Sequence, residues 1–162
     1  MYLEQFKIKN FRTIDDLSLT FNKGLNILIG ENNSGKTAIV DALRICIGYG
    51  NLRRDIYVKE SDFHFQRNII AEAATEIEFH LYFKIENPQE KGWFIDLLNA
   101  YEDGREDLQM HFKFYTEEKN GIKKLKYKVW GGANEGQLVS PDVLSLLYHV
   151  HLDALRDAEH FL

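Results

Sequence analysis

The sequence predicts an α/β fold, more narrowly an α+β fold with a mixed sheet. Antiparallel strands are expected on both sides of a central strand, which leads through a glycine-rich loop into a helix. An almost unbroken apolar stretch, Leu25–Ile29, leads into a loop that contains two glycines, Gly30 and Gly35. The residues that follow, 38–47, place their polar side chains at helical spacing. Several other stretches alternate polar and apolar residues with a period of two, which is typical of strands with one solvated face.

The first two strands are expected to pair with each other. In residues 5–9 apolar Phe6 and Ile8 alternate with polar neighbours, and residues 17–21 repeat the pattern. Only the short segment 10–16 separates them, so an antiparallel arrangement is favoured. After a turn at Lys23-Gly24, the apolar run 25–29 is expected to form a buried strand.

The loop after this strand contains a full phosphate-binding motif, G-x-x-x-x-G-K-[ST]. Its residues are Gly30, Glu31, Asn32, Asn33, Ser34, Gly35, Lys36 and Thr37. Glycine lets successive backbone N–H groups point inward, and the helix N-terminus adds partial positive charge, so the loop suits a triphosphate. We expect Lys36 to reach the β- and γ-phosphates of ATP and the Thr37 hydroxyl to ligate Mg²⁺.

The middle of the chain is expected to return to strands. The helix should stop at Gly48, and a polar connector covers residues 49–68. Residues 75–85 show the clearest alternation in the chain and predict a strand that Pro88 terminates. Apolar residues within 93–98 fit one face of a short helix.

The last third predicts a hairpin and two short elements. Residues 110–114 and 125–129 alternate in the manner of strands, and Asn120-Gly121 between them is a favoured hairpin turn. Pro141 should start a short helix through Leu147, and residues 149–152 read as a strand.

Composition limits the class of protein. A length of 162 residues suits one domain, and 44% hydrophobic with 28% charged residues is ordinary for a soluble globular chain. The net charge of −5 argues against a surface that coats nucleic acid everywhere. The sequence shows no leader segment and no long apolar stretch, so we expect a cytoplasmic protein without membrane contact. The single cysteine, Cys46, lies on the apolar helix face and is expected to be a core thiol.

The order of these motifs resembles the N-terminal half of an ABC-type ATPase head. Residues 6–12, 25–37 and 41–44 are similar to the RecF, SMC and Rad50-like ATPases. Residues 60–63 and 151–158 are similar to segments of the OLD family, which pairs such an ATPase with a Toprim nuclease domain. The resemblance implies an ABC-ATPase-like P-loop head, N-terminal lobe, over residues 1–162. It also implies that the Walker B, signature and nuclease regions lie elsewhere.

The resemblance also suggests roles for residues outside the loop. Arg12 would lie near the phosphates, where its guanidinium neutralises oxygens; the alternative is a surface arginine in a turn. Arg53 and Arg54 would approach a partner's γ-phosphate or remain solvated charges. Asp153 or Asp157 would ligate Mg²⁺ where the family has a Q-loop glutamine, or one of them would cap the next helix.

Three further features have a functional and a plainer interpretation. Gln66 is a rival for the glutamine role, although its surroundings look like connector. Six lysines with aromatic neighbours would suit a DNA backbone or form an ordinary solvated face; they are Lys113, Lys119, Lys123, Lys124, Lys126 and Lys128. His149 and His151 would lie on one side of a strand, but no third metal ligand stands at a recognisable spacing.

Together these observations predict the ATP- and Mg²⁺-binding half of an OLD- or RecF-like ATPase in DNA repair or phage defence. A second head, or the remainder of the same protein, would complete the site. The cycle would gate DNA processing or cleavage by a Toprim endonuclease domain, and this chain alone would hydrolyse little ATP. The alternatives are a small P-loop kinase and a nucleotide-regulated interaction module that does not hydrolyse ATP.

Overall fold

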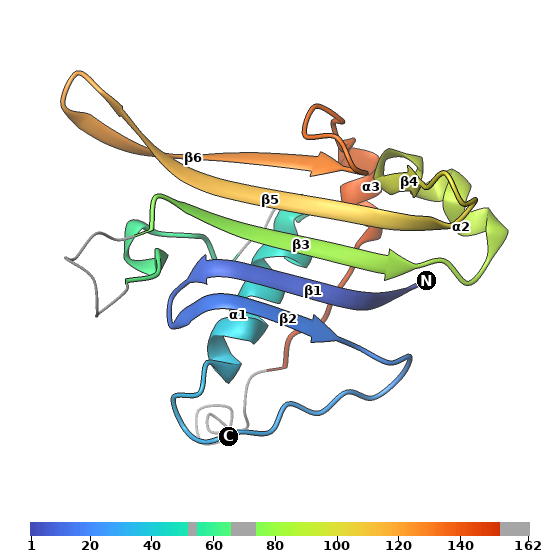
Figure 1. Cartoon of the computed structure of the whole chain (residues 1–162), viewed down its shortest axis with the longest axis horizontal. Helices are drawn as coiled ribbons and strands as arrows, with labels where there is room; N and C mark the ends of the chain where they lie inside the picture. Colours follow the sequence, from blue (N-terminus) through green and yellow to red (C-terminus); the bar gives the residue numbers. More distant parts are fainter. Residues whose placement is uncertain (52–54, 66–73, 153–162) are drawn as a thin grey trace, which may run out of the picture.

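The fold is one antiparallel sheet with a helix packed against one of its faces (Figure 1). The computed structural model describes residues 1–51, 55–65 and 74–152. The strands are β1 (Tyr2–Phe11), β2 (Ile14–Thr20), β3 (Glu76–Lys84), β4 (Leu98–Ala100), β5 (Glu106–Lys119) and β6 (Ile122–Gly131). The helices are α1 (Lys36–Ile47), α2 (Pro88–Trp93) and α3 (Pro141–Leu146), with 3-10 turns η1 (Gly48–Gly50), η2 (Glu60–Asp62) and η3 (Ile95–Leu97). None of the helices in these ranges is long and apolar enough to cross a membrane.

The sheet has the strand order β2-β1-β3-β5-β4, and β6 also pairs with β5. The predicted pairing of the first two strands is confirmed, with Phe6 opposite Leu19. The predicted hairpin is confirmed as β5 and β6, and both turn residues, Asn120 and Gly121, have positive φ as a type I′ turn requires. The strand predicted over residues 75–85 is confirmed as β3, whose alternate residues are buried.

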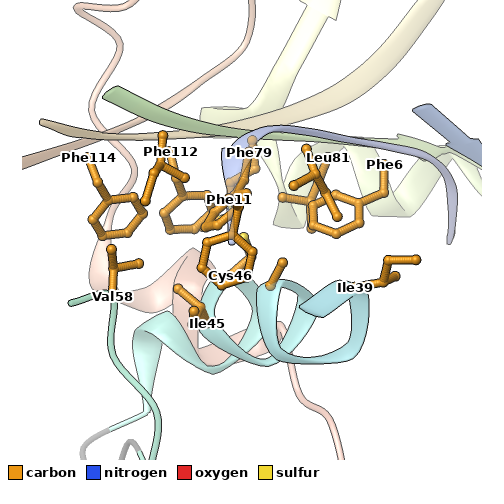
Figure 2. Close-up of a cluster of buried hydrophobic side chains, with 14 of the residues drawn as sticks. Phe6, Phe11, Ile39, Ile45, Cys46, Val58, Phe79, Leu81, Phe112 and Phe114 are labelled. Carbon is orange, nitrogen blue, oxygen red and sulfur yellow. The ribbon is translucent and has the colours of Figure 1, made fainter. Parts of the chain in front are cut away.

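The core lies between the sheet and α1 (Figure 2). Phe6, Phe79 and Phe112 project from three neighbouring strands and are fully buried. Ile39 and Cys46 face them from α1. Burying one such aromatic or aliphatic side chain stabilises a fold by about 1.5–3 kcal/mol. The prediction that Cys46 is a core thiol is confirmed, and burial raises the pKa of its thiol well above the usual value.

The apolar run before the phosphate loop departs from the prediction. Residues 25–29 form no strand in the structure, and Leu25 and Ile29 are 86% and 91% exposed. A β-strand needs a neighbouring strand for its backbone hydrogen bonds, and no described segment pairs with this one. Figure 1 shows the segment running away from β2 before the chain turns back to α1. The expectation of a buried strand here is therefore wrong for this chain by itself.

Two shorter elements were also predicted wrongly. The helix expected over residues 93–98 lies earlier, because the Asn87 side chain accepts a hydrogen bond from the Gln89 N–H at 3.0 Å and Pro88 occupies the first turn. The following residues instead form η3 and the edge strand β4. Residues 149–152 form no strand, and nothing in the described sheet pairs with them.

The sheet face opposite α1 carries a histidine pair. His80 of β3 lies opposite His111 of β5, and their Nδ1 atoms are 2.8 Å apart. His111 Nε2 lies 3.0 Å from the carbonyl oxygen of Gly132, so this nitrogen donates and Nδ1 is left to accept from His80. Burial, and then the charge of His80, lowers the pKa of His111 to about 4, and burial also lowers the pKa of His80.

This lowered pKa predicts loss of stability in mild acid. An unfolded histidine has a pKa of about 6.5, so between that value and about 4 the unfolded chain binds more protons than the folded one. The free energy of unfolding should therefore fall as the pH drops through this window. Urea unfolding at several pH values should show a shallower fall in His111→Gln. The control Tyr82→Phe removes a neighbouring hydroxyl that does not titrate there, and equal pH slopes in all three proteins would contradict the assignment.

Candidate phosphate-binding site

The phosphate loop lies at the N-terminus of α1 and borders a small hollow. The hollow has a volume of about 250 Å³. Its lining residues are Arg12, Thr13, Asn32, Asn33, Gly35, Lys36, Thr37 and Ala38. The loop and the turn between β1 and β2 are far apart in the sequence, and the packing of α1 under the sheet brings them together.

Gly35 makes the junction between loop and helix. It caps α1 with φ of +89°, a left-handed conformation that glycine adopts without strain. A Cβ atom at this position would lie 3.4 Å from Thr13 Oγ1, so the close approach of the neighbouring turn also favours glycine. The first turn of α1 carries no acidic residue, which leaves the partial positive charge of the helix end available to an anion.

Lys36 currently donates to the loop itself. Its Nζ lies 2.6 Å from the carbonyl oxygens of both Gly30 and Glu31, and 3.4 Å from Ser34 Oγ. These contacts hold the ammonium group over the loop, where phosphate oxygens would replace the carbonyl groups. Thr37 borders the same hollow. The Lys36 ammonium group and the N-terminus of α1 fit the phosphates of a nucleotide, and the Thr37 hydroxyl fits its Mg²⁺.

Arg12 lies at the same hollow, in the turn between β1 and β2. Its Nε donates to Asp62 Oδ1 at 2.8 Å and its Nη1 donates to Asp41 Oδ2 at 2.5 Å. Burial opposes the charge of Arg12, but these two carboxylates outweigh it and raise the pKa of the guanidinium. The structure thus brings together Arg12, Lys36 and Thr37, three residues singled out in the sequence.

Asp41 and Asp62 were not predicted as site residues. Asp41 belongs to the polar stripe of α1, and Asp62 belongs to the segment 60–63 that resembled the OLD family. The one feature that marks Asp62 is burial, since only 6% of this charged residue is exposed. Buried carboxylates need a partner, which here is Arg12.

The sequence offered several further candidates for the site. Five of them lie outside the described residues: Arg53, Arg54, Gln66, Asp153 and Asp157. His149 packs near Gly48 at the far end of α1. Within the described ranges no group of three or more His, Cys, Asp or Glu side chains is arranged to hold a metal ion.

Three of the six lysines of the hairpin region form ion pairs with glutamates: Lys113, Lys126 and Lys128. Lys113 contacts Glu76 at 2.6 Å and Glu78 at 3.3 Å, and Lys128 contacts Glu135 at 2.5 Å. These carboxylates, which lie on β3 and on the segment after β6, offset part of the positive charge that a DNA backbone would require. The plainer interpretation, a solvated strand face, agrees better with these contacts.

Comparison with known proteins supports an ATPase. The DNA double-strand break repair Rad50 ATPase of Pyrococcus abyssi is 33% identical over 91 residues, which is 56% of this chain and 10% of that protein. The DNA repair protein RecN of Rickettsia conorii is 35% identical over 83 residues, 51% of this chain and 15% of that protein. The chain thus spans only a small part of the length of these curated relatives.

Solved structures show the same fold. A structure from work on ATP-driven dimerisation of SMC ATPases matches with a TM-score of 0.58 at 22% identity, over 91% of this chain and 78% of that one. The Smc head domain from Pyrococcus yayanosii matches with a TM-score of 0.57 at 22% identity, over 90% of this chain and 25% of that one. The fold is therefore the α/β N-terminal lobe of an ABC-type ATPase head. The family model described as "AAA ATPase domain" matches residues 1–135, and the chain belongs to that family.

Proposed function

We propose that this chain is the nucleotide-binding half of an ATPase head, which binds ATP with Mg²⁺ through residues 30–37. The observation that carries the proposal is the convergence of Lys36, Thr37 and Arg12 on one hollow at the N-terminus of α1. When bound, ATP and Mg²⁺ would supply the reactive phosphoanhydride and an electrophilic cation. Lys36 would hold the terminal phosphates, Thr37 would orient the cation, and Arg12 would add donors to the phosphate oxygens.

The exposed apolar run at residues 25–29 supports the proposal that the chain is one half of an ATPase head. Leu25, Ile27 and Ile29 expose most of their apolar surface immediately before the loop. An extended apolar run with unpaired backbone is a surface that another strand completes. A second part of the head, supplied by the same protein or by another chain, would dock there and bring the catalytic carboxylates that activate water.

The proposed biological setting is DNA processing. Its support comes from the relatives, since the Rad50 ATPase and RecN are both DNA repair proteins. The likeness of residues 60–63 to the OLD family further suggests a Toprim nuclease as the domain that the ATPase cycle controls. The fold favours this head over a small P-loop kinase, since the neighbouring structures are SMC ATPase heads.

Nucleotide binding should depend on Lys36. Lys36→Ala removes the ammonium group that faces the phosphates, and hydrogen bonds to charged groups contribute about 1.5–3 kcal/mol. We therefore expect affinity for Mg²⁺-ATP to drop about tenfold or more in calorimetric titration. Lys123→Ala, a lysine in β6 away from the loop, is the matched control and should bind like the wild type. Equal affinity in Lys36→Ala and wild type would refute the loop assignment.

The effect of Mg²⁺ on ATP affinity should require the Thr37 hydroxyl. Thr37→Val keeps the shape of the side chain but lacks the oxygen that ligates Mg²⁺. The gain in ATP affinity on adding Mg²⁺ should therefore shrink in Thr37→Val, whereas Thr37→Ser should retain it. Titrations with and without Mg²⁺ measure this difference. An unchanged Mg²⁺ effect in the valine variant would remove Thr37 from the metal site.

ATP turnover should require the remainder of the head. We expect steady-state phosphate release by this chain to stay at the level of the Lys36→Ala variant, and we expect no DNA cleavage. A longer protein or complex that covers residues 25–29 should hydrolyse ATP, and Ile27→Glu should weaken that activation because it places a charge in the contact. Leu138→Glu alters another exposed apolar residue, away from the loop, and serves as control. Robust Lys36-dependent turnover by this chain alone would overturn the half-head proposal.

A further inference from the structure

The Arg12 guanidinium is held by two carboxylates but keeps one nitrogen available. Asp62 accepts from Nε and Asp41 accepts from Nη1, so the third nitrogen, Nη2, lies between the two bonded groups. Within the part of the chain that the structure describes, Nη2 has no hydrogen-bond partner. Because a guanidinium is planar, fixing Nε and Nη1 also fixes the direction in which Nη2 points.

Asp62 is itself fixed on several sides. Its Oδ2 accepts from the Lys59 N–H at 2.8 Å, so each carboxylate oxygen has its own donor. Its carbonyl oxygen accepts from the Arg12 N–H at 2.7 Å. The adjoining Phe63 forms an isolated bridge with Phe11, and both aromatic side chains are buried. The carboxylate is therefore a rigid part of the fold, unlike the exposed carboxylates of the surface ion pairs.

Asp41 completes the arrangement from the other side. It projects from α1, the helix that begins with Lys36, and its second oxygen lies 3.4 Å from Arg44 Nη1. Arg12 is thus bound both to the helix that bears the phosphate loop and to the segment at residues 59–63. A solvated arginine would gain little from one surface pair, whereas two carboxylates on separate elements restrict its rotation.

We propose that Asp62 is a positioning residue of the nucleotide site: it fixes the guanidinium of Arg12, which lines the hollow beside Lys36, so that Nη2 would donate to a phosphate group bound there. This inference rests on the proposed binding of a nucleotide by the loop. Asp62 acts through Arg12 and touches no phosphate itself. Its carboxylate near an anion is electrostatically unfavourable, so its contribution comes from the orientation that it imposes on the guanidinium.

Nucleotide affinity would change in the opposite direction if Asp62 only held Arg12 away from the nucleotide or only neutralised its charge. Removing the carboxylate would then free a positive charge and tighten nucleotide binding. If Asp62 positions Arg12, the same change weakens binding, because the guanidinium must lose rotational freedom when the nucleotide binds. The sign of the effect therefore separates the two roles.

The test variant is Asp62→Asn, which is nearly identical in shape. Asparagine has one acceptor oxygen where aspartate has two, so it cannot accept from the Lys59 N–H and from Arg12 Nε at the same time, and it carries no charge to hold the guanidinium. We expect the affinity for a non-hydrolysable ATP analogue with Mg²⁺ to fall about fivefold to tenfold in calorimetric titration. Arg12→Gln should lose at least as much, and adding Asp62→Asn to it should cause no further loss. Asp55→Asn removes an exposed carboxylate paired with Arg44 and should bind normally.

Each outcome decides a separate point. Equal or tighter binding by Asp62→Asn would overturn the positioning role, and so would an equal loss in the Arg12→Gln background, since that pattern indicates general damage to the fold. Thermal unfolding of every variant identifies such damage. The proposed nucleotide function fails instead if the folded wild type and Lys36→Ala bind the analogue equally. A Lys36-dependent wild type with an unaffected Asp62→Asn leaves the function standing and refutes only this inference.

Discussion

The contact between α1 and the aromatic face of the sheet is the constraint on which the site depends. Phe6 and Ile8 of β1 are fully buried on this face, and Ile39 and Ala42 of α1 pack in the same core. The helix begins at the phosphate loop, and β1 runs into the turn that bears Arg12. One buried interface therefore determines how far the guanidinium stands from the loop. Since protein interiors are close-packed, this separation is set by side-chain volume and tolerates little change.

The same interface explains why the loop has its shape before any ligand binds. Gly35 lies against Thr13, so the helix end and the β1–β2 turn are in contact through a position that has no side chain. Lys36 is satisfied by carbonyl groups of the loop. Anion sites built from backbone and one helix end need little rearrangement, and most of the ordering cost is already met by the folding of the core.

Much of the fold could be predicted from residue alternation. The strands that contain Phe6, Phe79 and Phe112 each bury one face, and a period of two in the sequence records that fact directly. The apolar run at residues 25–29 shows the limit of the method. Hydrophobicity indicates that a segment is suited to burial but does not identify what covers it. The helix near Pro88 departs from the prediction for another reason: Asn87 caps a helix that begins at Pro88, whereas the alternating pattern before this proline indicates only that a strand ends there.

The sequence likewise predicts some residues of the candidate site and not others. Lys36 and Thr37 could be predicted because their partners are neighbours in one local motif. Asp41 and Asp62 could not, because they meet Arg12 across 29 and 50 residues of sequence, and no short spacing records such contacts. Asp62 follows Lys59, Glu60 and Ser61 in a polar segment, so nothing in its sequence surroundings indicates that this carboxylate is buried.

The phosphate loop is anchored at only one of its two ends. On the helix side it joins the core through α1, whereas on the other side it continues into residues 25–29, which pair with no strand of the described sheet and expose Leu25, Ile27 and Ile29. Whatever restrains this stretch also restrains the loop that follows it. Thermodynamic reciprocity then requires that a bound anion and a bound partner strengthen each other by the same factor. Anion binding by the loop and docking of a partner on residues 25–29 would then be thermodynamically linked.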